Sequence, residues 1–510
     1  MSKGKKVGLL VLVALVVIVG GLAVIIPLLF DVNRYRAQVA AQIQEETGKP
    51  AEIGHLALTI FPKVAIRVDN FSLGNPPGFP AGNFVAAKQI NVVVNPSALL
   101  HRSVEITSLE LKNLTLNMLE DTHGKWNFEN PPAKAAAPPA ESTGSSGPAF
   151  TLGVISKVTV SHGEVSVADL LASGAPAPPS VEVHGATIDL REVNLSAFSS
   201  AALQQPAAPE RVAPSRWRGP IVYAADGKGP MAAEGTLRAD ALRFGQLGVT
   251  KLETKMRLYP KQVFLDDLDL RCYGGKLTGN VSLNFGGANL KYRTDARLKG
   301  VNVAQFLEAF PQAKGMLTGT LDAAAKIDGT VVQSADPLAG IAGAGQASIR
   351  DGQMPSLQLG SNLRMLAKMV NLGPANGDPS SFSSLSSDFR IADSRLSSNK
   401  VALVGNGMEV DGSGNMTMAG DGTLDYQGTA SLAAGGSSSP LTNVLGSLTG
   451  ATFANGKLSF PFTVGGTFAK PKFGLKHGAT PTALPTNVQS VQKSVDTLRG
   501  LAGMFKKKQQ

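Results

Sequence analysis

The chain has 510 residues, of which 17% are charged, and it contains 56 glycines and 31 prolines. Soluble domains carry about 25% charged residues, so this turn-rich, lightly charged composition favours many short strands over long helices. The single cysteine, Cys272, excludes an intramolecular disulfide and a zinc ribbon, and the net charge of +10 comes from scattered Lys and Arg, which suits anionic lipid better than nucleic acid as a partner.

Residues 7–30 form an apolar run of 24 residues. As a helix this run would be about 36 Å long, enough to span a bilayer. A cleavable signal peptide is the alternative interpretation, but its apolar core is shorter and it needs a small-residue cleavage site, which residues 27–31 lack. Lysines at positions 3, 5 and 6 precede the run, so the positive-inside rule predicts a cytoplasmic tip and a single anchor over residues 1–30, with the rest of the chain outside the cytoplasm.

A helix is expected directly after the anchor. Asp31 or Asn33 is a suitable N-cap, and Gly48 is a suitable stop after Thr47. Spacings of three and four predict one apolar stripe along this helix, formed by Val32, Tyr35, Val39 and Ile43.

Beyond the helix the apolar period changes to two, which is typical of strands with one apolar face. The alternating sets are Leu56, Leu58 and Ile60; Val64, Ile66 and Val68; Ile90, Val92 and Val94; Leu109 and Leu111; and Leu114, Leu116 and Met118. The change of parity between Leu111 and Leu114 predicts a bulge or tight turn at Lys112 and Asn113. Similar alternation recurs to about residue 475.

These patterns divide the chain into the anchor, a β module with its leading helix (31–130), a linker-rich β region (131–220), a second β module (221–475), and a linker with a C-terminal amphipathic helix (476–510). Segments 131–149, 173–180 and 199–220 are rich in Ala, Pro, Ser and Gly and are predicted to be disordered or loosely packed. Helices are expected at 357–372 and 487–508.

The fold class is therefore mainly β. With few helices to cover it, so long a sheet must bury its apolar face against itself, a second sheet, or a lipid. A curled sheet with a lined groove and an array of β-sandwiches both satisfy this requirement, and composition alone favours the sandwiches.

Motifs that carry catalysis or bind metals are not found. The six histidines are scattered singly, Leu448 occupies the position where a nucleophile elbow has its serine, and a calcium-like start at Asp411 has Met416 in place of the turn glycine. We therefore expect no enzyme activity, no cofactor and no metal.

Several segments in a fixed order resemble the AsmA family of bacterial envelope proteins. Those near the N-terminus are Asp31 to Arg36, Thr47 to Lys49, Gly54 to Leu58, Phe61 to Val64 and Gly124 to Phe128; those further on are Tyr273 to Gly279, Gly340 to Gly352, Phe382 to Leu396 and Pro461 to Thr467, with Pro471 and Phe473. The first group is similar to the family's N-terminal module and the second to its C-terminal module.

The resemblance implies a periplasmic protein anchored in the inner membrane and related to TamB and to chorein-type bridge-like lipid transfer proteins. In those proteins a long curled antiparallel sheet forms an apolar trough for acyl chains. The resemblance therefore implies phospholipid transport between the inner and outer membranes, with the outer membrane or an outer-membrane protein as a further partner. It transfers no catalytic residue. The period-two residues nearest the anchor are the groove candidates: Val92, Val94, Leu109, Leu111, Leu114 and Leu116.

Two alternatives stay open. A non-enzymatic periplasmic scaffold that affects assembly of outer-membrane proteins would need no lipid groove. The predicted C-terminal helix, followed by Lys506 to Lys508, would act either as a cap on the end of the sheet or as a contact to an anionic membrane.

Overall fold

The computed structural model describes residues 31–61, 63–100, 103–129, 149–150, 154–198, 231–287, 289–311, 313–330, 339–355, 380–405, 407–417, 422–433, 451–467 and 470–475. The predicted anchor at residues 7–30 and the predicted helices at 357–372 and 487–508 lie outside these residues. Within the described part of the chain, none of the helices has the length and apolarity that crossing a bilayer requires.

The chain separates into two compact units. The first unit contains residues 1–350 and 388–396, and the second contains residues 351–387 and 397–510. Each unit is described below by itself.

The first unit begins with a short 3-10 helix, η1 (Val32–Tyr35), that leads into α2 (Arg36–Thr47). Asp31 caps η1 by accepting a hydrogen bond from the main-chain N–H of Asn33 at 3.0 Å, and Gly48 ends α2 with a φ of 68°. The capping residue Asp31 and the end of the helix at Gly48 were therefore predicted correctly. The residues of the predicted apolar stripe differ in exposure, since Val32 and Ile43 are half-buried whereas Tyr35 and Val39 are exposed.

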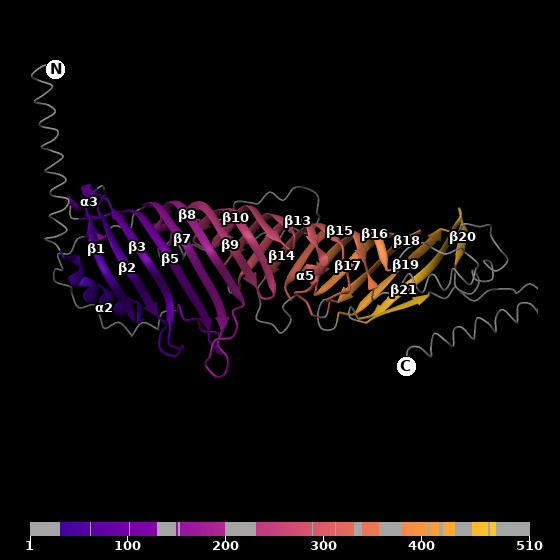
Figure 1. Cartoon of the computed structure of the whole chain (residues 1–510), viewed down its shortest axis with the longest axis horizontal. Coiled ribbons are helices and arrows are strands. Elements are labelled where there is room, and N and C mark those ends of the chain that lie inside the picture. The colour runs from indigo at the N-terminus through magenta and orange to yellow at the C-terminus, as the bar shows by residue number, and fades with distance from the viewer. Residues whose placement is uncertain are drawn as a thin grey trace, which may run out of the picture. The chain divides into compact units, whose positions relative to one another are not determined.

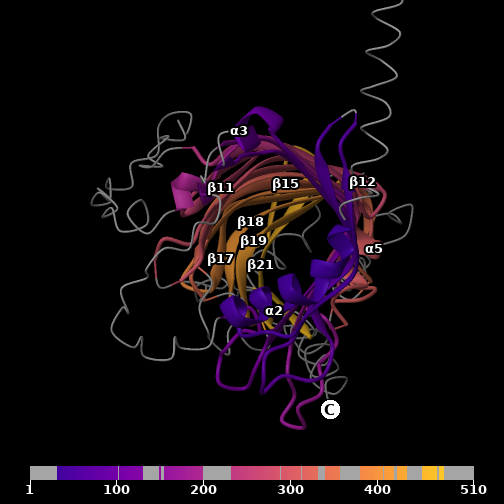
Figure 2. The ribbon, with the colours of Figure 1, turned by 90° about the vertical axis from the view of Figure 1, so that its left-hand side faces the viewer.

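The strands of the first unit form one continuous ladder (Figure 1). In order of pairing these are β1 (Ala51–Thr59), β2 (Ala65–Gly74), β3 (Asn83–Val94), β5 (Ile106–Glu120), β7 (Val154–Asp169), β8 (Val181–Asn194), β9 (Ala233–Phe244), β10 (Leu247–Tyr259), β11 (Gln262–Cys272), β12 (Gly275–Asn284), β13 (Lys291–Asn302), β14 (Thr320–Thr330) and β15 (Ile341–Gln353). Among the described residues no pairing joins β1 to β15, so this ladder is open. Figure 2, seen from the end that carries β1, shows that its strands follow a curve. One curved ladder is the architecture expected for a curled sheet, and the sandwich alternative is wrong for this unit.

One step of the ladder is parallel, which corrects the prediction of a purely antiparallel sheet. β5 pairs with β7 in parallel, and the short strands β4 (Ser103–Val104) and β6 (Ala149–Phe150) that precede them are also parallel. A parallel neighbour requires a connection of about a dozen residues or more that returns the chain to the starting edge. β5 ends at Glu120 and β7 begins at Val154, which leaves a connection long enough for a parallel pair, and the sheet continues on both sides of the Ala/Pro-rich insertion.

A row of left-handed residues crosses the strands at one level. They are Asn70 in β2, Asn113 in β5, His162 in β7, Gly185 in β8, Lys251 in β10 and Asp267 in β11, with φ between 51° and 63°. The register places the first three at the same level of β2, β5 and β7, with β3 lying between the first two of these strands, since Asp69 pairs with Gln89, Gln89 with Lys112, and Lys112 with Ser161. At such a residue the alternation shifts by one, so apolar residues are spaced by three, as in Val68 and Phe71, Leu111 and Leu114, Val249 and Leu252, and Leu265 and Leu268. The irregularity predicted at Lys112 and Asn113 takes the form of the positive φ at Asn113, whereas the pairing with β3 keeps its register from Lys112 with Gln89 to Leu114 with Ala87.

The remaining helices are short: α3 (Pro96–Leu100), η2 (Leu195–Phe198) and α5 (Val303–Leu307). Residues 173–180, predicted to be loosely packed, form an ordered turn between β7 and β8. The main-chain N–H of Leu171 donates to the carbonyl of Ala175, and that of Ala177 donates to the carbonyl of Asp169, each within 2.9 Å. The main-chain hydrogen bonds explain the order, because they do not depend on side-chain composition.

The second unit contains β18 (Met408–Thr417), β19 (Leu424–Ala433), β20 (Thr452–Ala454), β21 (Lys457–Gly466) and β22 (Pro471–Leu475). β19 pairs with β18 and with β21, and β21 also pairs with β20 and β22. Most residues of β17 (Arg395–Gly405) belong to this unit, and β16 (Ser381–Ala392) is divided between the two units. Phe460 and Leu458 are its most buried large side chains.

Candidate functional site: the apolar face of the first unit

One face of the first unit's sheet carries ion pairs between neighbouring strands. Arg238 lies 2.7 Å from Glu253, Lys255 lies 2.8 Å from Asp267, and Arg350 lies 2.8 Å from Asp322. The hydrogen bond to Asp267 raises the pKa of Lys255. All three pairs are well exposed, and exposed ion pairs contribute little to stability because water and salt screen them. Their place in the structure is informative because it identifies the face that is turned to water.

The other face carries rows of apolar side chains that follow the register from strand to strand. Directly paired residues lie on the same face of a sheet. One row consists of Ile66, Val92, Leu109, Val158, Leu190, Gly235, Met256, Leu265, Val281, Thr294 and Ile327. The row beside it consists of Leu56, Val68, Ile90, Leu111, Val160, Ile188 and Leu237. We call the surface formed by these two rows the apolar face.

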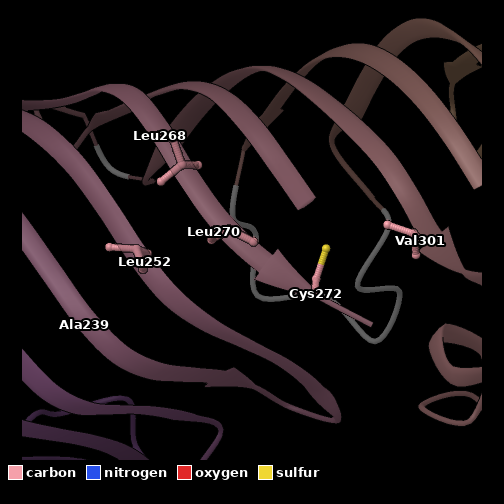
Figure 3. Packing of buried hydrophobic residues seen from close by; sticks show 6 residues of the cluster. All are labelled: Ala239, Leu252, Leu268, Leu270, Cys272 and Val301. Carbon is pink, nitrogen blue, oxygen red and sulfur yellow. The ribbon is translucent and has the colours of Figure 1, made fainter. Parts of the chain in front are cut away.

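A buried cluster lies beyond the left-handed row, in β9 to β13 (Figure 3). It consists of Ala239, Leu252, Leu268, Leu270, Cys272 and Val301. Burial raises the pKa of the Cys272 thiol, which keeps it neutral and apolar. Cys272 also lines a small pocket of about 230 Å³ together with Val249 and Tyr273. The apolar character of the sheet is therefore found on both sides of the parallel pairing of β5 with β7, and also beyond the segments 131–149 and 199–220.

Among the residues that the structure describes, no second layer covers much of the apolar face. Leu109, Leu111 and Val158 are only half-buried, and Ile66 is 39% exposed. The described helices contact the ends of the ladder and its turns, with α2 against β1 and α5 against β13. A sheet normally buries its apolar face against another layer, so these half-buried side chains form a surface that is available to an apolar ligand.

The six residues predicted as groove candidates lie together on β3 and β5. Val92 pairs with Leu109, and Leu111 is one step along the neighbouring row. Leu114 and Leu116 lie beyond Asn113, paired with Ala87 and Val85, and Val94 is buried opposite Ile106. The structure thus brings all six onto two adjacent strands; their contact with lipid stays a prediction.

The prediction was too narrow, because the apolar face extends through β7 to β14. Leu190, Met256, Leu265 and Ile327 occupy positions equivalent to Val92, yet they were not among the candidates. The alternation around Leu265 and Val281 was visible in the sequence. The missing information was the register, which alone shows that these strands continue the same rows.

The first unit is thus an open curved sheet with one charged and one apolar face, and the described residues contain no metal-binding cluster. The chain belongs to the AsmA family: the family model matches residues 1–176 and 223–401, as the resemblance predicted. Comparisons with curated proteins and with solved structures gave no match.

Proposed function

We propose that this protein is a non-enzymatic envelope protein that shields the acyl chains of phospholipids on its apolar face as they pass between the inner and outer membranes. In this proposal residues 7–30 anchor the chain once in the inner membrane, and the remainder lies in the periplasm. Membership of the AsmA family supports this assignment. The observation that carries it is the row of directly paired, mostly apolar residues from β2 to β14, in which only Gly235 and Thr294 are not apolar side chains.

The physical argument concerns the barrier to lipid transfer. Exposing acyl chains to water costs about 0.8 kcal/mol per CH2, so two chains of roughly sixteen carbons cost on the order of 20 kcal/mol. A continuous apolar surface removes most of this barrier because the chains stay in contact with side chains at each step. The headgroup stays in water and needs no specific pocket. Nothing in such a surface drives transport in one direction.

The test uses neighbouring positions on opposite faces of β5. A photo-crosslinking amino acid replaces Leu109, on the apolar face, or Glu110, the next residue, which is exposed and turned to the other face. After irradiation of cells, we expect lipid adducts at position 109 and none at 110, detected by mass spectrometry of the purified protein. Equal labelling at both positions, or no adduct at 109 in a folded protein, would exclude the groove and leave the scaffold role as the better account.

A further inference from the structure

The helical segment at the start of the first unit exposes apolar and basic side chains side by side. Tyr35 is 45% exposed and Val39 is 40% exposed, and both belong to the apolar stripe that the sequence predicts along this helix. Arg34 and Arg36 flank Tyr35. The guanidinium of Arg34 lies 4.7 Å from the centre of the Tyr35 ring and donates to its hydroxyl at 2.7 Å. We call Arg34, Tyr35, Arg36 and Val39 the N-terminal surface.

This surface is held firmly against the sheet. The side-chain oxygen of Asn33 accepts a hydrogen bond from the main-chain N–H of Leu56 at 3.0 Å, and Arg36 donates to the carbonyl of Gly54 at 2.9 Å. Both bonds are made to β1, the first strand of the ladder, and Figure 2 shows α2 at this end of the unit. The orientation of the N-terminal surface relative to the sheet is therefore fixed.

The charges of α2 have the opposite order to the one that stabilises a helix. Anions are favourable near a helix N-terminus and cations near its C-terminus, by about 0.3–1 kcal/mol each. Here the first turn has no acid and the last turn has no base; instead Arg36 begins the helix and Glu45 and Glu46 lie in its last turn. Helix stability does not explain this order of charges. An anionic surface next to the N-terminal half of α2 would explain it, because such a surface attracts the arginines and repels the glutamates.

The apolar run of residues 7–30 ends at Phe30, directly before this segment. Because of that proximity, we propose that the N-terminal surface lies on the headgroups of the membrane that holds residues 7–30. The ring of Tyr35 and the side chain of Val39 enter the interfacial layer, and Arg34 and Arg36 lie near lipid phosphates. This inference rests on the proposed anchor. It places β1, and with it the start of the apolar face, next to the bilayer.

The experiment uses the full chain in lipid nanodiscs that contain phosphatidylcholine with or without phosphatidylglycerol. Cys272→Ala removes the native thiol, and a spin label is attached at Val39→Cys or, as the matched control, at Ala41→Cys, which is exposed on the same helix but lies off the Tyr35 and Val39 flank. Collisions of the label with oxygen, which concentrates in lipid, and with a water-soluble nickel chelate are measured.

We expect the label at position 39 to be severalfold less accessible to the nickel chelate than the label at 41, most clearly in the anionic discs. Arg34→Gln with Arg36→Gln should shift position 39 toward water by roughly fivefold for each arginine removed; Gln at 36 can still donate to Gly54. If both labels are equally accessible to nickel while the chain stays in the discs, the surface contact is wrong and the anchor stands. If the chain does not enter the discs at all, the anchor and this inference are both wrong.

Discussion

Asn127 and Leu119 exchange two hydrogen bonds. The main-chain N–H of Asn127 donates to the carbonyl oxygen of Leu119 at 2.9 Å, and the N–H of Leu119 donates to the side-chain Oδ1 of Asn127 at 3.0 Å. The side-chain amide of Asn127 also donates to the carbonyl of Asn117 at 2.8 Å and to Oδ1 of Asn75 at 2.9 Å. Asn127 is fully buried. The side chain of Asn127 thus makes the main-chain hydrogen bonds that a neighbouring strand would otherwise make at the end of β5. Asn127 belongs to the segment Gly124 to Phe128, which resembles the AsmA family.

Asn127→Ala removes three side-chain hydrogen bonds and leaves the N–H of Leu119 without its acceptor. We expect a loss of about 2–4 kcal/mol in the free energy of unfolding and faster amide exchange at the end of β5. Chemical denaturation and hydrogen exchange measure these effects. His123→Ala, an exposed change in the same turn, is the control and should be within about 0.5 kcal/mol of the native chain; equal effects of the two changes would contradict the bridging role.

The carboxyl group of Glu120 gives a pH dependence. Burial, reinforced by the nearby carboxylates of Asp169, Asp121 and Glu129, raises the pKa of Glu120. The folded chain therefore keeps this proton over a pH range in which the unfolded chain has lost it, so stability falls as pH rises through that range. At neutral pH the full penalty is present. Below about pH 4 the group is mostly neutral in both states and the penalty disappears.

Glu120→Gln should consequently raise the melting temperature at pH 7 by about 1–2 °C, since repulsions at a partly exposed site are small. The gain should vanish at about pH 4. Thermal unfolding at the two pH values measures it. Glu110→Gln on the same strand is the control, because the register partners of Glu110, Asn91 and Thr159, are uncharged. If Glu120→Gln raised the melting temperature by the same amount at both pH values, the cause would not be the ionised carboxylates.

His162 tests the row of left-handed residues. At a φ of 53° a β-branched side chain is strained, whereas glycine is not. His162→Val should lower the free energy of unfolding by about 1–2 kcal/mol, while His162→Gly should be neutral or slightly stabilising. Denaturant titrations compare both with Ser161→Val, the preceding residue, which is outside the positive-φ row. A neutral valine at 162 would show that the chain relaxes this bulge without cost.

The apolar face is tested by placing a charge on it, in β3 or in β5, and by placing the same charge on the opposite face of β5. Leu111→Asp and Val92→Asp put a carboxylate among apolar side chains where lipid would pass, at a cost of several kcal/mol for burial of the charge. Both should abolish complementation of an envelope defect while the protein stays abundant. Lys112→Asp, on the exposed side, should complement normally. Full activity of both apolar-face variants would mean that this surface is not a conduit.

Strands with one apolar face were predictable because alternation at period two records directly which side chains avoid water, as in Val92 and Leu109. An irregularity at Lys112 and Asn113 was predictable for the same reason, since the parity of the apolar residues changes there. The parallel pairing of β5 with β7 was not, because it depends on the path of residues 121–153 and not on the strands themselves. The exposure of Tyr35 and Val39 was also unpredictable, since an amphipathic stripe does not reveal which surface it meets.

β5 and β7 are held together by strand pairing as well as by the peptide chain that connects them in sequence. Register pairs from Ser108 with Lys157 to Glu120 with Asp169 join β5 to β7, so this ladder does not require an intact peptide chain at residues 131–148. A protease cut within residues 131–148 should therefore give two fragments that remain together after purification, and the two pieces expressed from separate genes should assemble by strand pairing. We therefore expect that the chain can be cut between β5 and β7 although the apolar face continues from one of these strands to the other.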